Sequence, residues 1–110
     1  MNKSNIALIG LGSWGTNIFN NLCELKAIHT ACDLSSKTIH KKKKHHPSIN
    51  YTASFSAVLK NPGIKAVAIT TPASTHYEYA RRALLANKDV FVEKPLALSM
   101  ALGRVERKIF

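Results

Sequence analysis

The fold of this 110-residue chain is indicated most clearly by the residues Ile6-Ala-Leu-Ile-Gly-Leu-Gly-Ser-Trp-Gly15. Its first four residues are apolar, which is typical of a short strand buried on both faces of a parallel sheet. Three glycines spaced as G-x-G-x-x-G follow directly, and a helix is predicted from Ser13 onward. Its apolar stripe would consist of Ile18, Leu22 and Leu25, with Phe19 beside them.

A glycine-rich turn between a buried strand and an amphipathic helix predicts a dinucleotide-binding site. Gly10 permits the tight turn, Gly12 lets a pyrophosphate approach the backbone, and Gly15 lets the helix pack close to the strand. The pyrophosphate would lie on the free amides that begin at Ser13, where the helix dipole favours an anion. Trp14 either covers the pyrophosphate or packs at the start of the helix.

A second apolar run, residues 28–32, ends at Asp33, 18 positions after the last glycine of the motif. An acidic residue at this place can bind the ribose hydroxyls of a dinucleotide. Its charge would repel a 2′-phosphate and so favours NAD. NADP stays possible because of three neighbours, Ser35, Ser36 and Lys37. The alternative is a glycine-rich turn and a surface aspartate without a ligand. The loop lacks the Gly-Lys-Ser/Thr ending of nucleoside triphosphatases.

The rest of the chain continues the alternation of strands and helices. Further strands are predicted at 49–51, 66–69 and 90–92, and further helices at 36–46, from Ser54, from Thr75 and from Ser99. The first of these helices would run into a solvated basic loop. The third would begin with a Thr75–Glu78 capping box, turn Tyr77, Ala80 and Leu84 inward, and end at Asn87 in the left-handed conformation. This order predicts an α/β fold, a Rossmann-type doubly wound parallel sheet in three αβα layers, with residues 1–110 as one domain.

Candidate ligand-binding residues follow four of the predicted strands. Besides the glycine loop and Asp33, these are Thr71-Pro72 and Glu93-Lys94. Because parallel strands bring their carboxyl ends to one edge of the sheet, and ligands bind there in open α/β folds, we expect these segments to meet in one crevice.

The composition is strongly basic, with 16 Lys and Arg against 6 Asp and Glu and a net charge of +10. Residues 37–46 hold five of the lysines and no acid. This run could grip phosphate, a metal or, without specificity, a nucleic acid, but a solvated surface is the favoured interpretation. No residues are spaced for a zinc site. No apolar stretch reaches the ~18 residues of a spanning helix. We expect a cytoplasmic protein in which Cys23 and Cys32 are reduced thiols.

Four segments carry a resemblance to a known family. They are residues 10–15, Asp33, Thr-Pro-Ala-Ser-Thr-His at 71–76, and Asn-Lys-Asp-Val-Phe-Val-Glu-Lys-Pro-Leu-Ala-Leu-Ser at 87–99. The chain resembles the N-terminal NAD(P)-binding domain of the Gfo/Idh/MocA oxidoreductases. The valine-rich strand that ends in Glu-Lys-Pro is the most specific of these features.

The resemblance implies roles for individual residues. Thr71 and Pro72 would line the nicotinamide-ribose side, with His76 nearby, and Glu93 would neighbour the cofactor. Lys94 would reach the substrate hydroxyl or the nicotinamide ribose, so Lys94 and His76 are the catalytic candidates. The implied reaction is reversible hydride transfer between nicotinamide and a sugar or cyclitol alcohol. The alternative for His76 is a histidine with a structural role, and the alternative for Lys94 is an ordinary exposed lysine.

Members of this family continue into a substrate-binding domain that commonly supplies a catalytic histidine or aspartate and the oligomer interface. We therefore expect a truncated member, incomplete at its C-terminus, which meets a sugar-like substrate only when a second domain is present. Ala73, Ser74 and Asn87 depart from the residues common in the family. Two further hypotheses stay open: a non-catalytic nucleotide- or partner-binding remnant, and a basic nucleic-acid binder that rests on residues 37–46.

Overall fold

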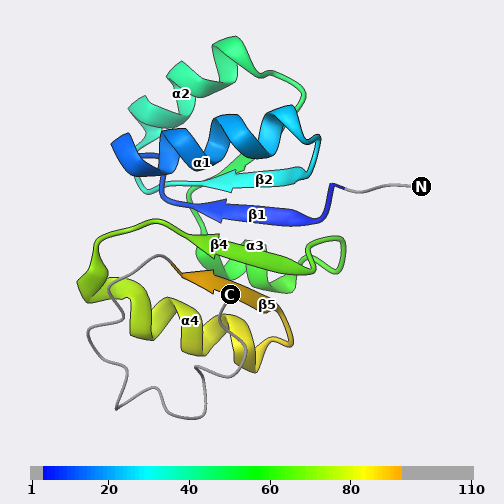
Figure 1. Cartoon of the computed structure of the whole chain (residues 1–110), viewed down its shortest axis with the longest axis vertical. Coiled ribbons are helices and arrows are strands. Elements are labelled where there is room, and N and C mark those ends of the chain that lie inside the picture. Colours follow the sequence, from blue (N-terminus) through cyan, green and yellow to red (C-terminus); the bar gives the residue numbers. More distant parts are fainter. Residues whose placement is uncertain (1–3, 93–110) are drawn as a thin grey trace.

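The described part of the chain is a parallel sheet with helices on both faces (Figure 1). The computed structural model describes residues 4–92, apart from the side chains of Ser13, Trp14 and Ala73. Glu93, Lys94 and the helix predicted from Ser99 lie outside the described residues. Within this part the strands are β1 (Ile6–Ile9), β2 (Ile28–Cys32), β3 (Asn50–Thr52), β4 (Ala66–Ile69) and β5 (Asp89–Val92).

The strand order is β3-β2-β1-β4-β5, and every described pairing is parallel. The chain winds outward from β1 to β3 and then crosses back to place β4 on the other side of β1. This confirms the predicted doubly wound, Rossmann-type sheet. The order reverses between β1 and β4, and in open α/β sheets ligands bind outside the carboxyl ends of the strands at that switch point.

Two clusters of buried side chains make the three layers. On one face, Leu8 and Ile28 pack with Phe19 of α1 (Ser13–Glu24), and Ile39 of α2 (Ser36–His45) joins them. On the other face, Val67 and other strand residues pack against α3 (Phe55–Lys60) and α4 (His76–Leu85). A 3-10 turn, Ala73–Thr75, precedes α4. None of the helices in residues 4–92 is long and apolar enough to cross a membrane.

The apolar stripe predicted for α1 is wrong at its last position. Leu25 is 70% exposed and lies beyond the helix, which ends at Glu24. Lys26 then adopts a positive φ of 56°, which turns the chain toward β2. Phe19, fully buried, is the main anchor of the helix.

Helix α4 has Thr75 as its N-cap residue, as predicted, but the predicted capping box is wrong. Thr75 has a helical backbone and makes no capping bond, because its hydroxyl is engaged with the Thr71 hydroxyl and the Pro72 carbonyl oxygen. The buried face is offset from the prediction: it consists of His76, Ala80 and Ala83, with Tyr79 and Leu84 packed beside it, and Tyr77 is only half-buried. The left-handed end at Asn87 is confirmed, with φ 63°.

The basic run is helical instead of forming a loop. Helix α2 extends to His45 and so includes Lys41–Lys44. Lysine is a good helix former, and basic residues in the last turn interact favourably with the helix dipole. The helix begins at a cap that the sequence analysis missed, in which the Ser35 hydroxyl accepts a hydrogen bond from the Thr38 amide at 3.2 Å.

Candidate functional site

The glycine loop joins the carboxyl end of β1 to α1. Gly10 has a φ of +102°, a conformation that favours glycine, and its amide donates to the Cys32 carbonyl at 2.8 Å. A side chain at Gly15 would collide with the Gly10 carbonyl oxygen and would lie 2.8 Å from the Thr70 hydroxyl oxygen. Gly10 and Gly15 therefore let α1 begin directly against the end of the sheet.

The N-terminus of α1 is open. Gly12 is its N-cap residue, makes no side-chain cap, and would place an added Cβ in space with no atom within 4 Å. The first turn carries no acidic residue. The first amides of a helix lack intrahelical acceptors and carry the positive end of the helix dipole, so this geometry suits an anion such as a pyrophosphate. The side chains of Ser13 and Trp14, predicted to lie here, are outside the described part.

Asp33 links β2 to the glycine loop. Its Oδ2 accepts a hydrogen bond from the Leu11 amide at 2.7 Å, and its Oδ1 accepts one from the Ser35 amide at 2.8 Å. The carboxylate is half-buried, so its remaining lone pairs can face a ligand. Asp33, which the sequence predicts as a ribose ligand, thus lies beside the loop predicted to hold the pyrophosphate.

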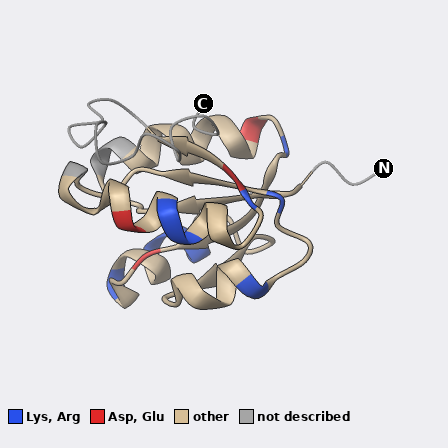
Figure 2. Ribbon diagram, turned by 90° about the horizontal axis from the view of Figure 1, so that it is seen from below, with Lys and Arg blue, Asp and Glu red and all other residues tan. Residues whose placement is uncertain are grey.

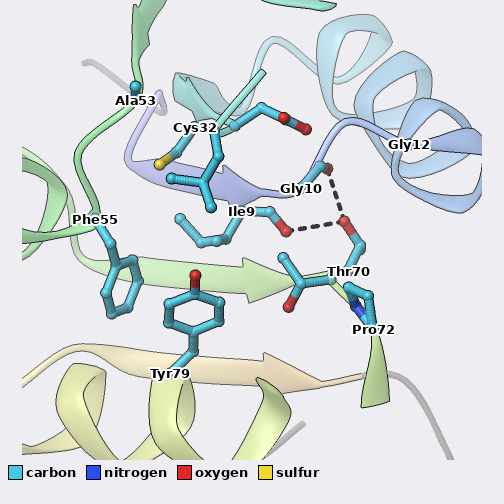
Figure 3. Close-up of a pocket in the computed structure, with 12 residues that line it drawn as sticks. Ile9, Gly10, Gly12, Cys32, Ala53, Phe55, Thr70, Pro72 and Tyr79 are labelled. Atoms are coloured by element: carbon cyan, nitrogen blue, oxygen red, sulfur yellow. Dashed lines mark hydrogen bonds between the residues drawn. The ribbon is translucent and has the colours of Figure 1, made fainter. Parts of the chain in front are cut away.

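A cavity of about 300 Å³ opens at the carboxyl ends of the central strands (Figure 3). It brings together five predicted site residues from three separate segments: Gly10, Gly12, Asp33, Thr71 and Pro72. The remaining lining residues are Ile9, Cys32, Leu34, Ala53, Phe55, Thr70 and Tyr79. The expected convergence of these segments on one crevice is therefore observed for the described residues.

Several lining residues escaped the sequence analysis. The Thr70 hydroxyl lies 3.0 Å from the Ile9 carbonyl oxygen and 2.8 Å from that of Gly10, so it fixes the end of β1 to β4. Figure 3 shows Phe55 and Tyr79 side by side at one wall, and their ring centroids are 4.6 Å apart. Thr70 directly follows the strand predicted at 66–69, so its place at the carboxyl end of that strand could have been found from the sequence. The two rings come from different helices and meet only through tertiary packing.

Cys32 contributes a buried thiol to the cavity wall. Its side chain is 3% exposed, and burial, together with the negative charge of Asp33, raises its pKa to about 11. A thiol with this pKa stays protonated and weakly nucleophilic near neutral pH. Both Cys32 and Cys23 are free cysteines, as predicted.

His76 lies beneath the Thr71-Pro72 turn and does not line the cavity. It is 6% exposed, and its Nε2 is 2.8 Å from the Thr71 carbonyl oxygen. Because a carbonyl only accepts, Nε2 carries the proton and donates. Nδ1 is buried and has no hydrogen-bond partner among the described residues. In this geometry the imidazole supports the backbone of the turn that borders the cavity.

No group of three or more His, Cys, Asp or Glu side chains within the described residues could hold a metal ion.

Comparisons with known proteins agree with this architecture. The Gfo/Idh/MocA family model, described as an oxidoreductase family with an NAD-binding Rossmann fold, matches residues 4–105. The chain is 45% identical over 56 residues to the uncharacterized oxidoreductase YhhX of Escherichia coli (strain K12), covering 51% of this chain and 16% of that protein. It is 54% identical over 43 residues to scyllo-inositol 2-dehydrogenase (NAD(+)) of Bacillus subtilis (strain 168), covering 39% of this chain and 13% of that protein.

A solved structure, a probable dehydrogenase from Thermotoga maritima, matches with a TM-score of 0.83 and 26% identity over 94% of this chain. The match covers 32% of that protein's chain. The chain therefore spans about a third of this solved structure and less than a fifth of the two curated relatives.

Proposed function

The chain belongs to the Gfo/Idh/MocA family of oxidoreductases, and we propose that residues 1–110 bind a nicotinamide dinucleotide across the carboxyl edge of the sheet. One observation carries the proposal: the glycine loop, Asp33 and the Thr71-Pro72 turn border one cavity at the switch point of the sheet. These segments are far apart in the sequence, and each could have a structural explanation alone. Their convergence matches the general location of dinucleotide sites in this fold class.

The pyrophosphate would bind at the glycine loop. The uncapped N-terminus of α1 supplies amide donors, and the open space above Gly12 lets phosphate oxygens approach the backbone. The side chains of Ser13 and Trp14 are assigned to the same subsite. This fit rests on backbone geometry, so it tolerates substitution of neighbouring side chains better than substitution of Gly12.

The adenosine half would occupy the cavity next to Asp33. The carboxylate would accept hydrogen bonds from the ribose hydroxyls, which supports NAD(H) as a ligand. Phe55 and Tyr79 supply an apolar wall on which part of the ligand can pack.

The nicotinamide half would extend toward the Thr71-Pro72 turn, which His76 supports from beneath. When bound, nicotinamide accepts or donates a hydride. We assign Glu93 a place beside the cofactor and Lys94 the orientation of the reacting hydroxyl of a sugar or cyclitol alcohol. A relative named scyllo-inositol 2-dehydrogenase (NAD(+)) supports the cyclitol class.

Isothermal titration of the 110-residue chain with NADH at low salt tests the binding proposal. We expect one saturable site, weakened about tenfold or more in Asp33→Ala, the loss typical of hydrogen bonds to a charged group. Asp89→Ala is the matched control, because Asp89 is an exposed aspartate at the other edge of the sheet. Absence of saturable heat from a folded chain, or equal affinities of the two variants, would refute the assigned ribose role.

Catalysis is tested separately by following NADH formation from NAD and scyllo-inositol. Turnover that disappears in Lys94→Ala while NADH still binds supports the assigned role of Lys94. Binding without turnover would mean that residues 1–110 act as a nucleotide-binding unit only.

A further inference from the structure

Helix α2 concentrates positive charge that the proposed dinucleotide does not need. Residues 34–77 contain seven lysines and no acidic residue, and five of these lysines lie in α2. Basic residues also outnumber acidic ones along the described ribbon (Figure 2). Lys41–Lys44 are consecutive, and because neighbouring residues of a helix differ by about 100° in direction, these four side chains surround one turn. NAD(H) is proposed to bind through backbone amides and Asp33, so the lysines of α2 have no role in holding it.

Part of this turn lines a second cavity, of about 530 Å³, between α1 and α2. We call it the basic cavity, because each ionisable side chain that lines it is a lysine or a histidine. Lys42 is held in place there, since its Nζ lies 5.2 Å from the centroid of the buried Phe19 ring. The basic cavity offers ammonium groups and hydroxyl donors to an anion. The polar side chains of its lining are those of Lys41, Lys42, Lys44, His45, Thr16 and Thr38.

The lysines of α2 repel one another. Lys37 and Lys41 are four residues apart, Lys41 and Lys44 are three apart, and like charges at these spacings destabilise a helix. Residues 34–45 include no acidic side chain that could compensate this charge. A bound polyanion would replace the repulsion by attraction. Helix α2 therefore gains more from an anionic partner than a surface helix of mixed charge does.

The shape of the basic cavity favours a single strand of nucleic acid as this polyanion. A cavity of this volume admits one phosphodiester backbone but not a duplex, whose major groove alone is about 12 Å wide. A flat membrane surface could not enter it either. Lys41 and Lys44 are about 4.5 Å apart along the helix axis, close to the rise of about 3.4 Å between successive phosphates of one strand. None of the described lining side chains is Phe, Tyr or Trp, so bases would have no stacking platform there.

We propose that α2 and the basic cavity bind the phosphodiester backbone of single-stranded RNA or DNA, without sequence preference. This inference goes beyond the proposed function and does not depend on it, although Gly12 lines both cavities. Lysines that neutralise phosphates release counterions, so log affinity falls linearly with log salt concentration, by about 0.7 per phosphate of a single strand. Three or four neutralised phosphates give a slope of about −2 to −3.

Fluorescence anisotropy of the full 110-residue chain with labelled oligouridylate and oligothymidylate of about 12 nucleotides tests this proposal. The two strands should bind with similar affinity and with the stated salt slope between about 50 and 200 mM salt. Lys41→Gln with Lys44→Gln should weaken binding about tenfold or more at low salt and reduce the slope by about 1.4. Lys41→Arg with Lys44→Arg keeps the charge and should keep the affinity.

Lys60→Gln with Lys65→Gln is the matched control. It removes the same charge from two exposed residues that do not line the basic cavity, and it should change the affinity less than about threefold. Lys41→Gln with Lys44→Gln relieves repulsion within α2, so it should not lower the free energy of unfolding. Urea denaturation of both double variants therefore separates lost binding from lost folding.

Equal weakening by the two glutamine double variants would overturn the site and indicate diffuse attraction of polyanions. A duplex of the same length that binds as tightly as the single strands would overturn binding in the basic cavity. A preference above about tenfold for RNA or for DNA would overturn recognition through the backbone, because it requires contacts to the 2′-hydroxyl or the bases. A chain that binds NADH but neither strand overturns this inference alone. A chain that binds both strands but not NADH overturns the proposed function alone.

Discussion

The Asp33 carboxylate accepts a hydrogen bond from the Leu11 backbone amide, with 2.7 Å between Oδ2 and the amide nitrogen. This bond ties the end of β2 to the glycine loop that follows β1. The other carboxylate oxygen, Oδ1, accepts from the Ser35 amide and so positions the residue that caps α2. One side chain thus organises the loop, the adjoining helix and the proposed ribose site.

Asp33→Asn should destabilise the fold as well as weaken NADH binding. The asparagine side chain has one oxygen and one NH₂ group, so one of the two backbone amides would face a donor. We expect the free energy of unfolding to fall by about 1–3 kcal/mol, measured by urea denaturation. In Asp89→Asn, an exposed control at the opposite edge, it should change by less than about 0.5 kcal/mol. Equal stabilities of the two variants would contradict the organising role of Asp33.

Two glycines of one motif should respond differently to alanine. Gly15→Ala places a methyl group against the Gly10 carbonyl oxygen, so we expect a loss of about 3 kcal/mol or more, or no folding. At Gly12 an added methyl group meets open space, and the φ is an ordinary −69°. Gly12→Ala should therefore lower the free energy of unfolding by less than about 1 kcal/mol. Gly12→Ala should nevertheless weaken NADH binding, because its methyl group occupies the proposed pyrophosphate space.

Thermal denaturation and NADH titration of these two variants check this contrast. A well-folded Gly15→Ala protein would show that α1 does not need the close approach to β1.

The sequence predicted most of the fold because strand positions depend on local apolar runs. Four of the described strands, and the parallel arrangement that their alternation with helices requires, follow from such runs. Strand β3, Asn50–Thr52, is mostly polar and begins one residue after its predicted position. The N-cap residue of α4 and the burial of Ala80 were predicted, but the capping box was not formed, because the Thr75 hydroxyl is engaged with the Thr71 hydroxyl and the Pro72 carbonyl oxygen. The cavity that Lys41, Lys42 and Lys44 line beside Gly12 was also missed, because it depends on how α2 packs against α1.

The site residues could be predicted where a polar residue lies just after the end of a strand, as at Asp33 and Thr71. Phe55 and Tyr79 were not predictable as a pair, because α3 and α4 bring them together only after both pack on the same face of the sheet. For His76, the sequence predicted a place near the site. Its hydrogen bond to the Thr71 carbonyl oxygen was not predicted, because it depends on how α4 packs beneath the turn.

Alkaline pH should destabilise the protein through Cys32. Burial raises the pKa of this thiol from 9.0 to about 11, so the unfolded state loses its thiol proton at lower pH than the folded state does. The resulting stabilisation is complete below pH 9 and is lost as the pH rises toward 11. Linkage gives a loss of about 2 kcal/mol across this interval.

The stability difference between wild type and Cys32→Ala, measured by urea denaturation at several pH values, isolates the effect of Cys32 from that of other titrating groups. This difference should shrink by about 2 kcal/mol between pH 9 and pH 11. A constant difference would contradict the raised pKa of Cys32.

Lys88 should contribute to stability at the edge of the sheet opposite the cavity. Its side chain is 7% exposed, and its Nζ donates to the carbonyl oxygens of Asn61 and Ile64 at 2.8 and 2.6 Å. Burial lowers its pKa, and the charge of Lys65 lowers it further. Lys88→Met keeps the aliphatic stem but leaves two carbonyl oxygens without this donor, so we expect a loss of about 2–4 kcal/mol.

Lys65→Met, at an exposed neighbour, serves as the control and should change the unfolding free energy by less than about 0.5 kcal/mol in the same denaturant titration. Equal stabilities of the Lys88 and Lys65 variants would show that the two hydrogen bonds of Lys88 are unimportant. NADH affinity should be unchanged in both, since neither residue lies near the cavity.

Two-dimensional NMR of the labelled 110-residue chain, titrated with NADH, shows directly whether a dinucleotide binds at the carboxyl edge of this sheet. Binding at this edge predicts saturable shifts of the backbone amides of the glycine loop, Leu34 and Thr70-Thr71, with those of Gly63 and residues 87–89 unmoved. Shifts confined to the opposite edge, or no shifts in a well-folded spectrum, would contradict it.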